Sequence, residues 1–473
     1  MSDYKELLKH SGNYLFANLA TKALSFISIP VYTSLLIVED YGVTSVFSST
    51  VGIVTVLLTL NTEVAISRYY YDANDESDFK KFVGTSAKLT GLIFCLLSIL
   101  LIIFVGPLSR YLDFEILLTL CIVPVSLFSI VNSFFQQIYQ PLLKSRKIAV
   151  VSSIQAYLAF GLSVVFILLL NDKKYYGQVW GSIVAMVCIG TYYIKQIKPY
   201  FINSFDRKYI KYILNYSIPY LPYSLSGIIV AQLGKLIIGQ QQGFESAGLY
   251  SFASNIAALM LLFIFVIHSA WNPFYFKYMN KKDYKSLDND YDLIWRITLF
   301  GGACLSLFGK EIGLFLGRPE YATSLYLIPI LVVGYCLYQW SYVYMRNVGY
   351  VKKTIWNAVV VVTSGISNIV LNSVLFTSFG ATGVAFAFSL SYMIMLILSW
   401  AINKYILKQY VPTVYHFMVP FMISIILIVL GSLCDEHISS QNILLMIKIA
   451  IIMVAISTLF PAYIKKMYFF IRR

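Results

Sequence analysis

The sequence is poor in charge and in the residues that carry most enzyme chemistry. Only 12% of its residues are charged, and the 473 residues include 4 histidines and 6 cysteines. The histidines lack metal-ligand spacing, and no two cysteines form a CxxC pair. No Gly-rich loop is followed by Lys and Ser or Thr, which excludes an ATPase with such a phosphate loop. We therefore expect no metal, no cofactor and no catalytic site, and a protein that is not an enzyme.

Long polar segments are missing as well. Hydrophobic residues make up 59% of the chain, outside the range of ordinary soluble domains. Each apolar run can cross ~30 Å of hydrocarbon as a helix, and the runs do not alternate as barrel strands do. The predicted fold is all-α, a polytopic membrane protein with about 14 transmembrane helices. The expected spans are 11–36, 41–66, 82–105, 115–140, 148–170, 175–198, 213–238, 247–275, 293–316, 321–345, 354–378, 381–403, 412–433 and 442–463.

Positive charge is concentrated in every second loop. Most of the 36 Lys and Arg residues, Arg346 among them, lie in the two tails and the even-to-odd loops. The opposite loops hold Arg110, Lys173, Lys174, Lys310 and Arg318. Basic residues near span ends stay in the cytoplasm, so both termini are expected there. The net charge of +14 is then a topology signal, and no basic soluble domain is present to bind nucleic acid.

The outward loops are too short for a catalytic domain. The longest surrounds Lys310 to Glu320. A membrane polysaccharide polymerase or glycosyltransferase would need catalytic acids or Arg and His clusters in sizeable outer loops. The sequence therefore favours transport over catalysis.

Weak internal similarity divides the first twelve spans into six and six. Gly42-Val43-Thr44-Ser45 opens the second span, and Gly248-Leu249-Tyr250-Ser251 opens the eighth. Spans six and twelve open with glycine pairs, Gly177 with Gly181 and Gly380 with Gly383. We expect two six-helix lobes related by a parallel pseudo-two-fold axis, with a site between them. The expected parts are an N-terminal lobe at 1–198, a basic cytoplasmic linker at 199–212, a C-terminal lobe at 213–403, and an appended helix pair with a basic tail at 404–473.

Several stretches carry a family resemblance over nearly the whole chain. They run from Asn13-Tyr14 through Ile29-Pro30 to Tyr41-Gly42, from Ile218-Pro219 to Trp271-Asn272-Pro273, and from Phe379 to Ala387. The chain resembles polysaccharide transporters of the multidrug/oligosaccharidyl-lipid/polysaccharide exporter superfamily, most of all Wzx-type O-antigen flippases. Many relatives have an Asp before a basic residue in span seven, where this chain has Gly234-Lys235. Any role of that acid does not carry over.

Four lysines lie inside predicted spans, where a charge costs at least ~2.5 kcal/mol and needs a partner, a wet cavity or a route to the interface. Lys22 is deepest and forms a polar stripe with Asn18 and Ser25, which we expect to face a lumen. Lys88, and Lys235 with Gln232, are further cavity candidates, although Lys88 can also snorkel to the cytoplasm. We expect Lys448, near the outer end of the last span, to snorkel.

Neutral polar stripes and one acid complete the candidate site. Asn132, Gln136 and Gln140 recur at helical spacing in span four, and Tyr335, Gln339, Tyr342 and Arg346 in span ten. Either stripe can line a cavity or join helices. Glu63 is the clearest intramembrane acid, and Arg68 lies five residues after it in the sequence. The two residues are candidates for a gate or coupling site or for a structural ion pair.

A cavity lined by lysines and neutral polar groups suits an anionic, hydroxylated cargo. We expect a flippase in the bacterial cytoplasmic (inner) membrane that moves an oligosaccharide from the cytoplasmic to the outer leaflet by alternating access. The resemblance implies that the lipid is undecaprenyl diphosphate, that the product is O-antigen or capsule, and that a polymerase and a chain-length regulator are partners. The alternatives are a cation-coupled multidrug exporter of the same superfamily and, less favoured, a polymerase or glycosyltransferase.

Overall fold

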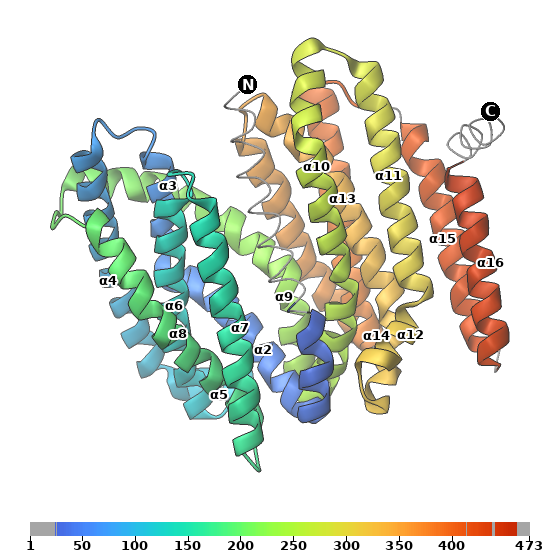
Figure 1. Ribbon diagram of the computed structural model, residues 1–473, viewed down its shortest axis with the longest axis horizontal. Helices are drawn as coiled ribbons and strands as arrows, with labels where there is room; N and C mark the ends of the chain where they lie inside the picture. Colours follow the sequence, from blue (N-terminus) through green and yellow to red (C-terminus); the bar gives the residue numbers. More distant parts are fainter. Residues whose placement is uncertain (1–23, 25, 413, 438–439, 461–473) are drawn as a thin grey trace. The chain divides into compact units, whose positions relative to one another are not determined.

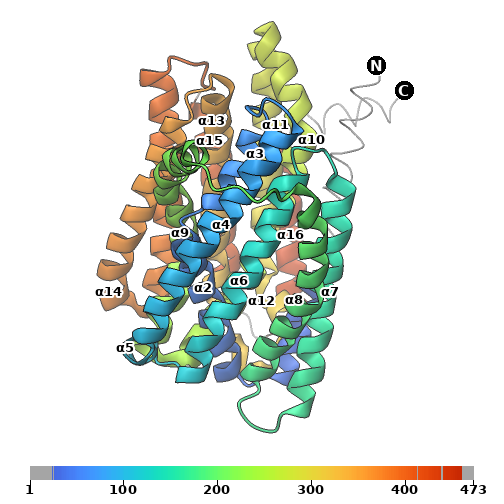
Figure 2. The same ribbon diagram turned by 90° about the vertical axis from the view of Figure 1, so that its left-hand side faces the viewer.

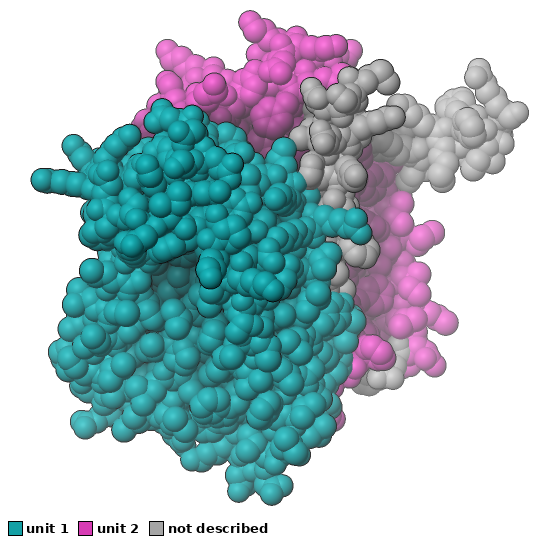
Figure 3. Space-filling model, turned by 60° about the vertical axis from the view of Figure 1, so that its left-hand side comes forward, with its two compact units in different colours: residues 1–251 teal, residues 252–473 magenta. Residues whose placement is uncertain are grey.

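A computed structural model of the chain describes residues 24, 26–412, 414–437 and 440–460. All regular structure in these ranges is helical (Figure 1), which confirms the predicted all-α class. Figure 3 colours the two compact units into which the chain folds, unit 1 at Met1–Ser251 and unit 2 at Phe252–Arg473. The boundary falls after the expected linker at 199–212, and the division into two six-helix lobes stays a prediction.

Unit 1 contains the elements up to the second part of α9, and its helices α2, α4, α6 and α8 run side by side in Figure 2. A short apolar helix, Phe26–Leu35, precedes them. The elements are α2 (Val38–Thr59), η1 (Thr62–Val64), α3 (Ala65–Tyr69), α4 (Glu76–Ile103), α5 (Val105–Leu112), α6 (Ile116–Tyr139), α7 (Ser145–Leu169), α8 (Tyr175–Ile197), η2 (Lys198–Tyr200) and α9 (Arg207–Ala257).

Unit 2 begins within the last turns of α9. Its elements are α10 (Leu259–Lys281), α11 (Tyr284–Leu307), α12 (Gly309–Leu316), η3 (Pro319–Leu327), α13 (Ile328–Tyr350), α14 (Ile355–Ala401), η4 (Ile402–Ile406), α15 (Val414–His437) and α16 (Gln441–Leu459). Helices α15 and α16 pair with each other and with α11. Phe417 of α15 joins them to the rest of the unit, because the centre of its ring lies 3.5 Å from the ring centre of the fully buried Trp340.

Ten helices among the described residues are long and apolar enough to cross a membrane, or eleven if the bent pair Tyr284–Leu307 and Gly309–Leu316 counts as one span. Two of the ten are interrupted by a glycine with positive φ, Gly243 (φ 82°) and Gly380 (φ 55°). The two halves of α14 fold back on each other, since Ser364 Oγ donates to the carbonyl of Ser391 at 2.8 Å. The total of fourteen stays a prediction, because most of the first run lies outside the described residues.

A tyrosine cluster fixes the start of α9 against α3 and α4. The ring of Tyr69 stacks on Phe82 with centroids 3.8 Å apart. The hydroxyls of Tyr69 and Tyr209 donate to the two oxygens of Asp78, at 3.0 and 2.5 Å. Tyr212 donates to Asp72 at 2.6 Å. The end of the predicted linker is therefore held in place by side chains as well as by the chain itself.

Candidate functional site

The deepest predicted cavity residues cannot be placed. Asn18, Lys22 and Ser25 lie outside the described residues, so their lumen-facing stripe stays a prediction. The remaining candidates on η1, α3, α4, α6 and α9 belong to unit 1, and those on α13 belong to unit 2.

Gln232 and Lys235 lie on the part of α9 that packs against α2. Ser49 Oγ of α2 donates to Gln232 Oε1 at 2.9 Å, so Gln232 joins two helices. One turn later, Lys235 is half-buried and has no hydrogen-bond or ion-pair partner among the described residues. Its ammonium is thus a charge in an apolar helix without a counterion in the described part of the chain.

Glu63 lies in η1, in the break between α2 and α3, where it packs against α6. It is 6% exposed, and Ser133 Oγ of α6 lies 3.4 Å from its Oε1. Its other oxygen, Oε2, is buried with no hydrogen-bond partner in the described residues. Arg68 pairs with Asp72 at 3.2 Å on the exposed side of the segment. Glu63 and Arg68 therefore do not form an ion pair with each other.

Two residues of the predicted stripe, Asn132 and Gln136, are half-buried on α6, while Gln140 is exposed just after its end. Gln136 Nε2 donates to Asn132 Oδ1 at 3.2 Å, as their i, i+4 spacing allows. Lys88 of α4 is half-buried, and no carboxylate of the described residues pairs with it. Lys88 and Lys235 are therefore half-buried lysines of unit 1 to which the described structure gives no hydrogen-bond partner and no acid.

A neutral polar cavity, which the sequence reasoning did not anticipate, lies between α2, α6 and α8. Its volume is about 240 Å³. It is lined by Thr44, Phe47, Ser48, Val51, Val125, Ser129, Gln178, Val179, Ser182 and Met186. Hydroxyl and amide groups recur at i, i+4 on two of these helices, Thr44 with Ser48 and Gln178 with Ser182. This spacing is the sequence signal that could have revealed the cavity.

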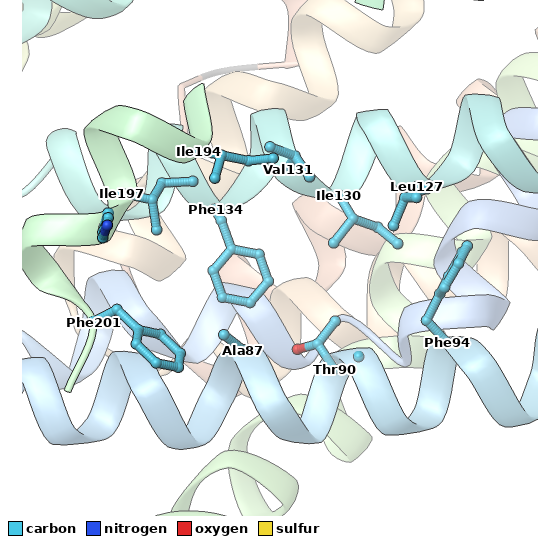
Figure 4. A pocket seen from close by; sticks show the side chains of 12 residues that line it. Ala87, Thr90, Phe94, Leu127, Ile130, Val131, Phe134, Ile194, Ile197 and Phe201 are labelled. Atoms are coloured by element: carbon cyan, nitrogen blue, oxygen red, sulfur yellow. The ribbon is translucent and has the colours of Figure 1, made fainter. Parts of the chain in front are cut away.

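A second cavity in unit 1 is almost entirely apolar (Figure 4). It has a volume of about 330 Å³ and lies between α4, α6, the end of α8 and η2. Phe94, Phe134 and Phe201 form its aromatic walls, and the small residues Ala87 and Gly91 lie along its α4 side. Lys198 is the one charged lining residue among those described. Such a lining suits a hydrocarbon chain and offers little to a sugar.

The stripe on α13 divides into packing residues and an exposed residue. Tyr335 is buried, with its ring 5.1 Å from Phe388, and Gln339 is fully buried. Tyr342 is 39% exposed, and its ring lies 4.4 Å from that of His268 on α10. A cavity-lining role for the three residues stays a prediction, and the observed exposure favours Tyr342.

Arg346 does not lie in a loop, where the topology count placed it. It lies within α13, four residues before the last residue of the helix, and is half-buried beside His268 and Trp271 of α10. The count failed because a basic residue near the end of an apolar run looks the same in sequence whether it faces water or protein. Its position on the stripe of Tyr335, Gln339 and Tyr342 was the usable signal.

The prediction that Lys448 snorkels is wrong. Its side chain is fully buried, and its ammonium lies 2.7 Å from Glu311 Oε1 and 2.8 Å from Asp435 Oδ1. The partners lie on α12 and α15, so Lys448 joins three elements of unit 2. The ammonium stays inside because two carboxylates replace the water that it would otherwise reach.

Comparisons with known proteins agree with this architecture. A sequence model of the family described as "Polysaccharide biosynthesis protein" matches residues 7–279. The "Lsg locus putative protein 1" of Haemophilus influenzae is 23% identical over 291 residues, which cover 59% of this chain and 68% of that protein.

Two solved structures have a similar fold. The structure "Lipid II flippase MurJ, inward closed conformation" has a TM-score of 0.70 at 14% identity, covering 95% of this chain and 99% of that one. An inward-facing multidrug resistance MATE family transporter of the MOP superfamily has a TM-score of 0.61 at 14% identity, with 87% and 95% covered. The many apolar helices and this fold identify a multi-pass membrane protein. Because the family match spans more than half of the chain, the protein belongs to the polysaccharide biosynthesis protein family and has the fold of the MOP-superfamily transporters.

Proposed function

We propose that this protein is a flippase that moves an oligosaccharide linked to undecaprenyl diphosphate from the cytoplasmic to the outer leaflet of the inner membrane. Membership of the polysaccharide biosynthesis family supports this class of cargo. The observation that carries the proposal is the pair Lys88 and Lys235, half-buried in apolar helices without a carboxylate partner in the described residues. Lys448, which is fully buried, has two such partners. The first two positive charges are therefore available to an anionic cargo.

The chemistry of such a cargo matches the distribution of residues. A diphosphate that loses hydration needs fixed positive charge, which lysine supplies. Sugar hydroxyls need neutral donors and acceptors, such as those of Asn132, Gln136 and Tyr342. The isoprenoid tail needs only an apolar surface and stays in the bilayer or in apolar grooves. The two halves then rock about the site by alternating access.

The finer assignments follow from the same proposal. The oligosaccharide serves O-antigen or capsule synthesis, as in Wzx-type flippases, and both termini are cytoplasmic because the basic loops lie on their side. A polysaccharide polymerase and a chain-length regulator would receive the flipped product. Transport of the lipid-linked unit involves no covalent step, so the protein acts without catalysis.

The test is transfer of a lipid-linked repeat unit in proteoliposomes that contain purified protein. We expect Lys22→Ala, Lys88→Ala and Lys235→Ala each to lower the rate, by about tenfold where a charge-assisted hydrogen bond is lost. Lys353→Ala, which removes an exposed lysine, is the matched control. Wild-type rates in all three span variants would contradict the proposed cationic site, and a wild-type protein that moves no lipid-linked sugar would contradict the function.

Glu63 favours the alternative of a cation-coupled drug exporter. An organic cation or a coupling ion needs a buried carboxylate, and Glu63 is buried with one oxygen unpaired in the described residues. Glu311 and Asp435, on α12 and α15, already pair with Lys448. Because Lys88 and Lys235 favour an anionic cargo, we nevertheless expect no export of cationic dyes from cells that overproduce the protein. Dye export abolished by Glu63→Gln would reverse the ranking of the two functions.

A further inference from the structure

Arg346 lies in an aromatic cage between α10 and α13 of unit 2. The carbon of its guanidinium lies 4.8 Å from the ring centre of Trp271, 5.5 Å from Tyr275 and 5.4 Å from Tyr342. Trp271 is 5% exposed and Tyr275 is fully buried. Three rings therefore hold the cation in one place.

The hydrogen bond that orients Arg346 is accepted by a neutral group. Nη2 of Arg346 lies 2.7 Å from Nδ1 of His268, which is 8% exposed. A guanidinium has no acceptor atom, so Arg346 donates and Nδ1 accepts. The imidazole is then neutral, with its proton on Nε2. His268 fixes the direction of the guanidinium without compensating its charge.

No carboxylate of the described residues forms an ion pair with Arg346. Asp290 lies behind the cage, where its Oδ2 accepts the indole N–H of Trp271 at 3.0 Å. Nη1 of Arg346 is buried without a hydrogen-bond partner in the described part of the chain. Arg296 of α11 differs, because it pairs with Asp292 at 2.8 Å. A half-buried guanidinium that is fixed in direction but lacks a counterion is costly unless an anion pairs with it.

We propose that Arg346, held by His268 and the rings of Trp271 and Tyr275, is a binding residue for a phosphate group of an isoprenyl diphosphate lipid. A guanidinium presents paired N–H groups that match two phosphate oxygens, which an ammonium cannot do. Tyr342, the exposed ring of the cage, lies where it can contact the first sugar. This inference rests on the proposed function and adds a phosphate-binding residue in unit 2 to the lysines of unit 1.

The test measures binding rather than transport. Purified full-length protein in detergent is titrated with geranylgeranyl diphosphate, geranylgeranyl monophosphate and geranylgeraniol by isothermal titration calorimetry. We expect Arg346→Gln to weaken diphosphate binding by about tenfold or more, as loss of a charge-assisted hydrogen bond requires. Arg346→Lys should be intermediate, and binding of geranylgeraniol should not change. Lys353→Gln removes the same charge from an exposed site and should bind like the wild type.

Three results would overturn the inference. One is an unchanged diphosphate affinity in Arg346→Gln. Another is an equal loss of geranylgeraniol affinity, which would mean that the arginine only holds the helices together. The third is displacement of the diphosphate probe by an equal concentration of phosphatidylglycerol, which would assign the site to a bilayer lipid. Trp271→Phe, which keeps a ring in the cage, provides a milder variant if Arg346→Gln fails to fold.

Failure of this inference and failure of the proposed function give different results. If wild-type protein binds the diphosphate through Arg346 but transfers no lipid-linked sugar, the inference stands and the flippase assignment falls. If wild type and Arg346→Gln transfer sugar and bind the probe equally, the flippase assignment stands and the inference falls.

Discussion

Gly42 and Gly248 lie backbone to backbone in unit 1, and the contact is reciprocal. A Cβ added to Gly42 would lie 1.8 Å from the carbonyl oxygen of Phe244 and 2.9 Å from the nitrogen of Gly248. A Cβ added to Gly248 would lie 2.2 Å from the carbonyl oxygen of Val38 and 3.1 Å from the nitrogen of Gly42. Val38 and Phe244 each precede their glycine by four residues. Each helix therefore meets the same part of the other.

The first prediction concerns this contact between the helices at Gly42 and Gly248, which we call the glycine crossing. Gly248→Ala should destabilise the protein by about 1–3 kcal/mol, because the new methyl group meets a backbone carbonyl that cannot move aside alone. The measurement is the midpoint of thermal unfolding in detergent. Gly227→Ala is the matched control on the same helix, since a Cβ there meets nothing within 4 Å. It should be neutral or stabilising by up to ~1 kcal/mol. Equal midpoints for the two variants would refute the close contact.

The glycine crossing shows how much of the fold can be predicted from the sequence. Hydropathy and the glycine positions were enough to predict apolar helices, and the internal similarity was predicted from Gly42 and Gly248. A reciprocal contact between repeat-related glycines is what a two-fold axis would produce, so it supports the repeat, while the six-plus-six division stays a prediction. The sequence did not indicate that these two glycines touch each other, because residue spacing carries no information on contacts across more than 200 residues.

Lys448 and its two acids give the second prediction. Lys448→Met keeps the volume of the side chain but leaves Glu311 and Asp435 close together without a cation. Breaking a buried ion pair in this way typically costs about 3 kcal/mol. Glu311→Gln should cost less, since Asp435 Oδ1 remains 2.8 Å from the ammonium. Thermal unfolding of the purified variants should therefore rank Lys448→Met below Glu311→Gln.

A triple variant provides the control. Lys448→Met combined with Glu311→Gln and Asp435→Asn removes all three charges, so it should be more stable than Lys448→Met alone. If adding the two neutral substitutions gives no recovery, the cluster does not act through charge.

The third prediction is a pH dependence at the loop that precedes α6. Lys173, which lies within ion-pairing distance, and the hydroxyl of Tyr176, 2.9 Å away, hold the pKa of Glu115 below its usual value of 4.5. A carboxyl whose folded pKa is lowered stabilises the fold above its unfolded pKa and loses that contribution as pH falls through the folded pKa. Unfolding midpoints should thus fall as pH drops below about 5, by an amount equivalent to less than ~1 kcal/mol for this exposed pair.

Glu115→Gln isolates that contribution. The variant should have a lower midpoint than wild type at pH 7, and the difference should vanish at acid pH. A difference that is the same at both pH values would show that the carboxylate charge is not involved.

Polar contacts between helices were the least predictable part of the candidate site. Lys448 and Glu311 are 137 residues apart, and Arg346 and His268 are 78 apart. A periodic pattern shows which residues share a helix face, but not which other helix that face meets. For this reason the sequence places Arg346 with the loops and predicts that Lys448 snorkels, and the structure contradicts both. Gln232 lies one turn from Lys235 on the same helix, as the sequence shows, but its bond to Ser49 cannot be seen in the sequence.

The fourth prediction concerns the energy source and depends on Glu63. Its carboxyl group is buried in the break between α2 and α3, and its side-chain hydrogen-bond partner among the described residues is the neutral Ser133. A group that can change charge inside a helix break is suited to couple proton entry to movement of the flanking helices. Glu63→Gln keeps the shape and the contact with Ser133 but removes the exchangeable charge. We expect a proton gradient across the proteoliposome membrane to accelerate transfer by wild type and to leave the rate of Glu63→Gln unchanged.

Glu76→Gln, which alters an exposed carboxylate paired with Lys80, should respond as wild type does. If the proton gradient accelerates transfer by Glu63→Gln as much as by wild type, Glu63 has a structural role. Net transfer then requires another source of energy.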